Sequence, residues 1–291
     1  MICKKIRNAV LTLYNAVDFP LRQLFSFSRG ASNLVNEPKA DLFANLPDLE
    51  RLAAEKRLSE LRGIFNLSEL GKKSSVDLYR KNLYYLDLLE NIFSAIDADL
   101  PANISAADVG SSHWFYVHAL LAFLGQWNTV EGREVSLIGF EPDAYRVYRD
   151  FRSRYDHACA HMAGLSGVCY HPEEFSEQAD AYDLITHFFP FIFLEDHLAW
   201  GLPRGKFSPG SLFQRSWRSL KPGGYLLVVN QGHRESQKAE VMLADLNPTR
   251  MESLVFSTPF FTYDLPSIVN LLQKPNDGGV TPAIEPDGRH E

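Results

Sequence analysis

Residues 219–228 read Ser-Leu-Lys-Pro-Gly-Gly-Tyr-Leu-Leu-Val and carry the clearest signal for the fold of this chain. A helical stretch at residues 212–220 ends there, and an apolar run at residues 225–230 follows. Gly223 and Gly224 permit a tight reversal between the two, because a residue without a Cβ takes turn conformations that other residues avoid. The stretch therefore predicts a helix, a turn and a buried strand in direct succession.

The same alternation of apolar runs and helical stretches extends over residues 101–274. The predicted strands are residues 104–110, 135–140, 168–170, 182–189, 225–230, 254–261 and 268–274. The predicted helices between them are residues 117–124, 145–162, 212–220 and 234–246. Short apolar strands alternating with helices are typical of a parallel sheet covered by helices on both faces. We therefore predict one α/β domain over residues 101–274, with a doubly wound, mostly parallel sheet.

Residues 1–100 show helical periodicity instead and are predicted to form an N-terminal helical extension. Ser74 and Asp77, three residues apart, resemble a capping box that begins a helix at residues 74–96. One face of that helix is continuously apolar, so it must be buried against another part of the protein. The linker to the α/β domain is short, and we expect the extension to pack on that domain rather than fold alone. The side chains expected to make this contact are Tyr79, Leu83 and Leu86.

The composition is that of an ordinary globular protein. The chain has 291 residues, 45% of them hydrophobic, and its 20 Phe, 12 Tyr and 4 Trp exclude disorder over the whole length. The formal net charge is −7, so we expect no nucleic-acid partner. The cysteines, Cys3, Cys159 and Cys169, form no CxxC pair, which argues against a disulfide framework or a thiolate zinc site and favours a cytoplasmic protein. Residues 275–291, rich in Pro, Gly and acidic residues, are predicted to be a disordered tail.

The first thirty residues are locally basic. Their charged side chains are Lys4, Lys5, Arg7, Arg22 and Arg29, against the single acid Asp18. The apolar run at residues 9–17 is too short to span a bilayer, and no convincing signal-peptide cleavage site follows it. We expect a first helix that packs on the body, with no stable membrane insertion. Weak peripheral contact of residues 1–30 with anionic lipid is the alternative.

Polar residues follow the first two predicted strands. In a doubly wound sheet, ligands bind at the carboxyl ends of the strands, where the strand order reverses. The first strand ends in Asp108-Val109-Gly110, and Gly110 lets the turn backbone approach a ligand closely. The second strand is followed by Glu141, an acid placed to accept both hydroxyls of a ribose. Gly110 and Glu141 are 31 residues apart, more than the roughly 20 of the dinucleotide fingerprint.

Four pieces in register resemble the class I S-adenosylmethionine-dependent methyltransferases, which have a Rossmann-like seven-stranded fold. They are Asp108-Val109-Gly110, Glu141, Asp183-Leu184-Ile185 and the stretch at residues 219–228. The resemblance covers residues 104–274. It implies S-adenosyl-L-methionine as the cofactor and methyl transfer to an O, N or C atom of a small-molecule acceptor. A nicotinamide-dependent oxidoreductase is disfavoured, because the GxGxxG fingerprint is absent.

The resemblance also implies which residues hold the cofactor. Asp108 and Gly110 would border its amino-acid part, Glu141 its ribose, and either Glu173 or Glu174 its adenine. The full set of implied cofactor-binding residues is Asp108, Gly110, Ser111, Ser112, Glu141, Pro142, Glu173 and Glu174.

The first motif departs from the family pattern. Ser112 stands where the family has its second glycine, and the bulky His113 and Trp114 follow. A glycine-poor turn leaves open a second interpretation, in which the chain is a catalytically degenerate relative that serves as a binding or scaffold protein.

His187 is the candidate catalytic residue. It ends the fourth predicted strand, where the family presents residues to the methyl group, and histidine is the natural base near neutral pH. His197 and His233 are weaker candidates. The tetrapeptide His-Phe-Phe-Pro at residues 187–190 differs from the Asn/Asp-Pro-Pro-Tyr pattern of methyltransferases that act on nucleobases, which disfavours DNA bases as acceptors. No metal site is predicted, because the spacing of His187, Glu195 and His197 matches no metal-binding template.

Overall fold

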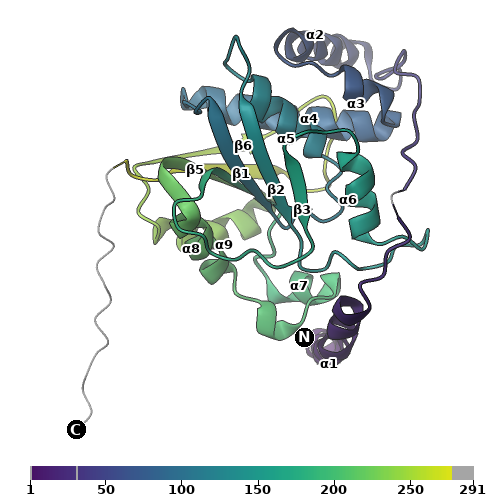
Figure 1. Ribbon diagram of the computed structural model, residues 1–291, viewed down its shortest axis with the longest axis vertical. Coiled ribbons are helices and arrows are strands. Elements are labelled where there is room, and N and C mark those ends of the chain that lie inside the picture. Colours follow the sequence, from purple (N-terminus) through teal and green to yellow (C-terminus); the bar gives the residue numbers. More distant parts are fainter. Residues whose placement is uncertain (1, 31, 277–291) are drawn as a thin grey trace.

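A computed structural model of the chain describes residues 2–30 and 32–276 (Figure 1). Its helices are α1 (Ile2–Phe25), α2 (Asp48–Ile64), α3 (Ser68–Lys72), α4 (Val76–Ala95), α5 (Val117–Gln126), α6 (Arg154–Met162), α7 (Leu194–Trp200), α8 (Pro209–Ser219) and α9 (Gly232–Ala244), with a 3₁₀ turn η1 at Arg204–Lys206. Its strands are β1 (Asn103–Val109), β2 (Glu134–Phe140), β3 (Val168–His171), β4 (Tyr182–Phe188), β5 (Leu220–Gln231), β6 (Arg250–Phe256) and β7 (Ser267–Gln273). The predicted disordered tail, except for its first two residues, lies outside the described residues.

The described strands form one seven-stranded sheet in the order β3-β2-β1-β4-β5-β7-β6. The pairs among β1 to β5 are parallel, whereas β7 runs antiparallel to both of its neighbours. The sheet is therefore mixed, and our prediction of a mostly parallel sheet is wrong in this respect. The reason lies at the end of the chain, where β6 and β7 are joined without a crossover helix and so pair antiparallel.

Helices cover both faces of the sheet. One apolar cluster joins α4 and α5 to the first face, and a second joins α8 and α9 to the other. The chain moves outward from β1 through β2 to β3 and then returns to place β4 on the other side of β1. This reversal creates a crevice at the carboxyl ends of β1 and β4, where open α/β sheets bind ligands.

Helix α4 joins the N-terminal region to the sheet. It contacts α5, β6 and β7, and the predicted contact residues Tyr79, Leu83 and Leu86 lie in the first apolar cluster. The helix is capped by Ser75, whose side chain accepts a hydrogen bond from the backbone of the third helical residue, and not by Ser74 as we predicted. That residues 1–100 cannot fold alone stays a prediction.

Gly223 and Gly224 lie within β5, which begins directly after α8, and not in a separate turn before the strand as we predicted. The pairing of β5 with β4 is irregular at this point, since Tyr182 pairs with Leu220 and Leu184 with Tyr225. Gly223 has a φ of +77°, and a Cβ on Gly224 would lie 3.0 to 3.2 Å from three main-chain oxygens. One predicted helix begins later than expected, and one observed helix was not predicted. The predicted helix at residues 145–162 begins only at Arg154, because residues before it form a loop that ends in a capping box at Ser153. Helix α7 was not predicted from the sequence.

Candidate active site

A cavity of about 660 Å³ opens at the carboxyl ends of β1, β2, β4 and β5. Its size is in the range of small-molecule sites, and its wall is mostly aromatic and apolar. Six of the nine predicted site residues line it, namely Gly110, Ser112, Glu141, Pro142, Glu174 and His187. The other three, Asp108, Ser111 and Glu173, lie outside the wall.

The loop after β1 contains positive φ angles, a backbone conformation that favours glycine. Gly110 has a φ of +82°, and Ser112 has a φ of +54° at the position where the family has its second glycine. The backbone N–H groups of Gly110 and Ser111 both donate to the carbonyl oxygen of Phe140, at 2.9 and 3.1 Å. A Cβ built on Gly110 would meet no atom within 4 Å, so this part of the loop borders open space.

Trp114 does not enter the cavity. Its side chain is fully buried and packs against Gly139 of β2, where a Cβ would lie 2.9 Å from two atoms of the indole ring. Trp114 therefore fills space beneath the loop and does not narrow the cavity.

We expect Gly139→Ala to lower the free energy of unfolding by about 1–3 kcal/mol, because the new methyl group overlaps a rigid buried ring. Gly125→Ala in α5 is the matched control, since its Cβ would meet only a methyl group at 3.8 Å and alanine favours helix. Urea denaturation measures both variants. Equal stability of Gly139→Ala and the wild type would contradict the close packing of Trp114.

Glu141 is held by the loops on both sides of it. One carboxylate oxygen accepts the Ser112 N–H at 2.9 Å, and the other accepts the Asp143 N–H at 2.8 Å. The side chain is buried, and this burial raises its pKa, while the nearby Arg154 opposes the shift. A carboxylate has about four lone-pair sites, so Glu141 can accept further hydrogen bonds from a ligand in the cavity.

Arg154 neutralises the acids of this loop. Its Nη1 lies 3.4 Å from both Glu141 Oε1 and Asp143 Oδ2, and its guanidinium lies 4.2 Å from the centre of the Trp200 ring. Asp143 also pairs with Arg22 of α1, at 2.9 Å. This cluster was not predicted from the sequence. Its signal was the second acid two residues after Glu141, but nothing local in the sequence identifies the cations that pair with it.

Asp108 lies behind the cavity wall. It is fully buried and accepts hydrogen bonds from the Tyr116 hydroxyl at 2.9 Å and the Thr186 hydroxyl at 2.6 Å. Burial raises the pKa of Asp108 to about 7, against the effect of these hydrogen bonds. Tyr116 stacks on Tyr85 at 4.3 Å between ring centres, and both rings line the cavity. Asp108 therefore lies outside the cavity and holds the hydroxyl of Tyr116, one of the rings in its wall.

The raised pKa of Asp108 predicts a pH-dependent effect of Asp108→Asn. In the wild type, the protonated acid stabilises the fold fully below its unfolded pKa near 4, and this contribution is lost as the pH rises through about 7. The amide does not titrate, so the stability difference between the variant and the wild type should change steadily between pH 4 and 7, in favour of the variant at the higher pH. Urea denaturation across this range measures it. A constant difference would contradict the raised pKa.

His187 lines the cavity and is fully buried. Its Nε2 lies 2.9 Å from the Ser216 hydroxyl of α8, while its Nδ1 has no hydrogen-bond partner among the described residues. Burial lowers the pKa of His187 to about 3, so the ring is neutral at pH 7. Of the weaker candidates, His197 also lines the cavity and has its Nε2 2.9 Å from a main-chain oxygen, whereas His233 lies outside the wall.

The two acids after β3 are now distinguished. Glu174 lines the cavity and forms ion pairs with Lys206 at 2.6 Å and Arg215 at 3.2 Å, which lower its pKa against the effect of burial. Glu173 is largely exposed and lies 3.4 Å from the Nδ1 of His171. Of these two acids, only Glu174 lines the cavity.

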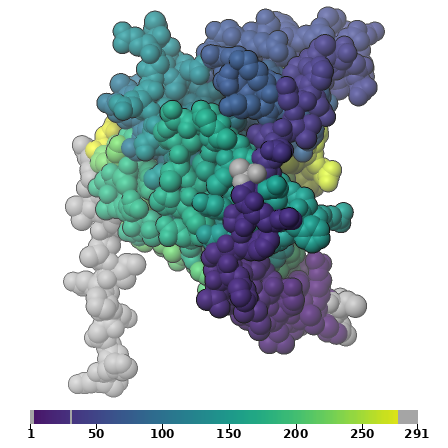
Figure 2. Space-filling view, turned by 45° about the vertical axis from the view of Figure 1, so that its right-hand side comes forward, coloured from purple at the N-terminus to yellow at the C-terminus, as the bar shows by residue number. Residues whose placement is uncertain are grey.

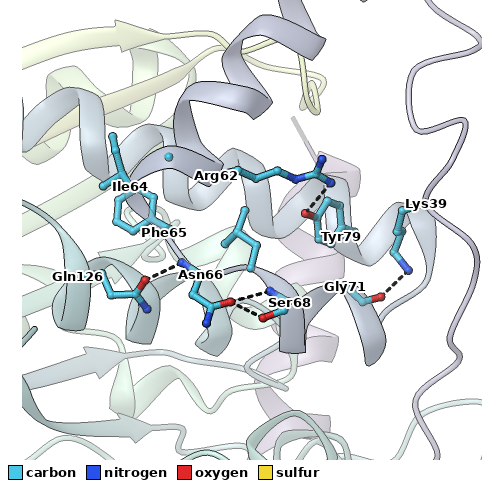
Figure 3. A pocket seen from close by; sticks show the side chains of 11 residues that line it. Lys39, Arg62, Ile64, Phe65, Asn66, Ser68, Gly71, Tyr79 and Gln126 are labelled. Carbon is cyan, nitrogen blue, oxygen red and sulfur yellow. Dashed lines mark hydrogen bonds between the residues drawn. The ribbon is translucent and has the colours of Figure 1, made fainter.

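A second cavity of similar volume lies among α2, α3 and α4 (Figure 3). The Lys39 ammonium donates to main-chain oxygens on its rim, that of Gly71 at 3.0 Å among them, and Arg62 reaches the Tyr79 hydroxyl at 3.5 Å. Asn66 bonds both Gln126 and Ser68, as Figure 3 shows. These polar groups already form hydrogen bonds within the protein, and they connect the helices that surround this cavity. The second cavity is therefore a weaker candidate for a ligand site than the cavity at the edge of the sheet.

Comparison with known proteins found resemblance only at the level of structure. No protein-family model and no curated protein sequence matches the chain. Among solved structures, it is similar to an S-adenosylmethionine-dependent O-methyltransferase from Thermotoga maritima, with 15% identity over 64% of each chain and a TM-score of 0.43. It is also similar to an S-adenosylmethionine-dependent methyltransferase from Aquifex aeolicus, with 15% identity over 74% of this chain and 97% of the other, and a TM-score of 0.44. A tRNA methyltransferase from Aquifex aeolicus matches at 9% identity over 64% of this chain and 68% of the other, with a TM-score of 0.42.

The strand order, the antiparallel β7 and the crevice between β1 and β4 define the class of fold. The chain has the fold of the class I S-adenosylmethionine-dependent methyltransferases, as the sequence motifs implied.

Proposed function

We propose that the protein is an S-adenosylmethionine-dependent methyltransferase that acts on a small-molecule acceptor. The observation that carries this proposal is that Glu141 and Gly110 lie in the wall of the same cavity, at the carboxyl edge of the sheet. The backbone of Gly110 borders open space there. The two groups come from adjacent parallel strands, so the sheet itself fixes their spacing.

The residues present fit the cofactor. Glu141 has acceptor sites left for the ribose hydroxyls, and the uncrowded backbone at Gly110 leaves room for the amino-acid part. Phe140 and Phe175 offer apolar surface in the same wall for the adenine. When bound, the cofactor supplies a methyl group activated on a sulfonium sulfur. The protein then has to orient the acceptor and exclude water, which provides much of the rate of such a reaction.

The rest of the wall favours an aromatic or apolar acceptor. Tyr85, Phe189 and Tyr263 line it, and the two tyrosine hydroxyls hydrogen-bond each other at 2.9 Å. His187 offers the polar group for such an acceptor, because its Nδ1 is buried and no described residue forms a hydrogen bond with it. With its pKa lowered to about 3, His187 is neutral at pH 7, carries a proton on only one ring nitrogen, and orients a hydroxyl or amine by hydrogen bonding. The formal net charge of −7 favours a small molecule over a nucleic acid as the acceptor.

Isothermal titration calorimetry with S-adenosylmethionine and with its demethylated product tests the proposal. We expect saturable binding of both. No heat at millimolar ligand would overturn the proposal and favour the degenerate binding or scaffold protein, which the glycine-poor turn at residues 110–114 left open.

A further inference from the structure

Helix α1 packs on the body of the protein through its polar side. Asn15 donates two hydrogen bonds, of 2.8 and 3.1 Å, to main-chain carbonyls in and just after α7. Gln23 donates to the carbonyl of Pro142 at 2.9 Å, and Arg22 pairs with Asp143 in the same loop. Together with the buried ring of Phe19, these contacts hold the C-terminal half of the helix beside α7 (Figure 1), and an exposed ion pair between Lys4 and Glu195 joins its first turn to the same helix.

The opposite side of α1 is an exposed apolar stripe. Its large side chains recur three or four positions apart, which places them on one face of a helix. They are Ile6, Val10, Leu13, Val17, Leu21 and Leu24, flanked by Tyr14 and Phe25. Leu13, Leu24 and Phe25 are 73%, 76% and 74% exposed. Figure 2 shows the purple atoms of the N-terminal segment on the outside of the molecule. The amphipathic arrangement is thus reversed, with the polar side inward and the apolar side outward.

The unpaired charges of α1 are positive. Lys5 and Arg7 are exposed in its first two turns and form no ion pair with another described residue. Asp18 is the one acid between residues 2 and 30; it is partly exposed at the edge of the stripe, and its charge is paired with Arg22. This local basic charge occurs in a chain whose formal net charge is −7. An apolar face with unpaired cations and no unpaired acid matches the surface of an anionic lipid bilayer.

We propose that α1 binds the surface of a membrane that contains anionic lipid, with its apolar stripe in the interface and its axis parallel to the bilayer. The polar hydrogen bonds to α7 and to the loop after β2 fix the helix flat on the protein, which makes the whole 24-residue helix, about 36 Å long, available for contact. None of the described helices is long and apolar enough to cross a membrane. The proposal does not depend on methyl transfer.

A second copy of the chain fits the stripe less well. In a parallel pair of α1 helices, Lys5 and Arg7 would face their own copies, which is repulsive. In an antiparallel pair aligned end to end, Lys5 and Arg7 would lie opposite residues 22 and 20 of the other helix, where the nearest acid, Asp18, is already paired with Arg22. Neither orientation compensates the charges, whereas anionic headgroups do.

Co-sedimentation of the full-length protein with vesicles tests the proposal. We expect binding to phosphatidylcholine vesicles that contain phosphatidylglycerol, weaker binding to pure phosphatidylcholine, and a loss of affinity at high salt. The double variant Leu13→Gln/Leu24→Gln should bind roughly tenfold more weakly or worse, because two exposed leucines no longer enter the apolar phase. The matched control is Leu49→Gln/Leu52→Gln in α2, which removes two exposed leucines, 84% and 59% accessible, far from α1 (Figure 1).

The control should bind vesicles like the wild type, and Lys5→Gln/Arg7→Gln should lose the preference for anionic lipid. The proposal is overturned if the wild type binds neither kind of vesicle, or if the α1 and α2 double variants bind equally. It is also overturned if sedimentation without lipid gives the mass of two copies, the stripe variant gives the mass of one, and no vesicle binding occurs.

Discussion

Replacing Arg154 with methionine should lower the free energy of unfolding by about 3–5 kcal/mol at neutral pH. The guanidinium is almost completely buried, with 2% of its side chain exposed, and it is shared by Glu141 and Asp143. Methionine fills part of the same volume but leaves two buried carboxylates with less compensating charge. The cost of an unpaired buried charge exceeds what the ion pair itself contributes, which is why truncating one partner has so large an effect.

Urea denaturation at several pH values measures this effect. In the variant, Glu141 loses its cation, whereas Asp143 keeps Arg22 and Arg146. The pKa of Glu141 should therefore rise further, so the loss of stability should be largest at neutral pH and should diminish as the pH falls and this acid becomes protonated. Arg149→Met, which changes an exposed arginine of the same segment, should stay within about 0.5 kcal/mol of the wild type. A loss below about 1 kcal/mol for Arg154→Met would contradict the buried cluster.

Glu141→Gln should weaken the binding of S-adenosylmethionine about 10- to 100-fold, which corresponds to about 1.5–3 kcal/mol for lost charged hydrogen bonds. The amide keeps the shape of the side chain and one acceptor oxygen, but it turns a donor toward the cavity or toward a backbone N–H. Calorimetry measures the dissociation constant below the unfolding temperature.

Asp143→Asn is the matched control for Glu141→Gln. It removes an acid from the same ion-pair cluster, and its side chain is absent from the cavity wall. We therefore expect a comparable loss of stability in the control but an unchanged dissociation constant. If both variants bind like the wild type, Glu141 serves only the fold. If the wild type itself shows no binding, the proposed function fails instead, so the two failures are distinguishable.

The sequence predicted the strands better than their directions. An apolar run such as residues 268–274 looks the same whether its neighbours are parallel or antiparallel, because burial on both faces leaves no alternation to read. The start of α6 was misplaced for a different reason. Residues 145–153 have helical periodicity, but backbone hydrogen bonds within the loop and the cap at Ser153 fix another conformation.

The candidate site was predicted where it depends on the ends of strands and missed where it depends on side-chain direction. Gly110 and Glu141 meet because parallel strands end at one edge. Asp108 does not reach the cavity, since its side chain points to the α5 side of the sheet, toward Tyr116. The contact between Arg154 and Glu141 depends on the path of the intervening loop, which no local pattern encodes.

The contact between Arg22 and Asp143 connects two parts of the protein thermodynamically. Helix α1 and the loop that carries Glu141 share this ion pair, so undocking of the helix changes the electrostatic surroundings of the loop. Any ligand of the loop that binds more tightly when α1 is docked must, by reciprocity, strengthen the docking of α1 by the same factor. Occupancy of the cavity and docking of α1 are thus coupled through this ion pair only to the extent that the ligand distinguishes the docked from the undocked loop.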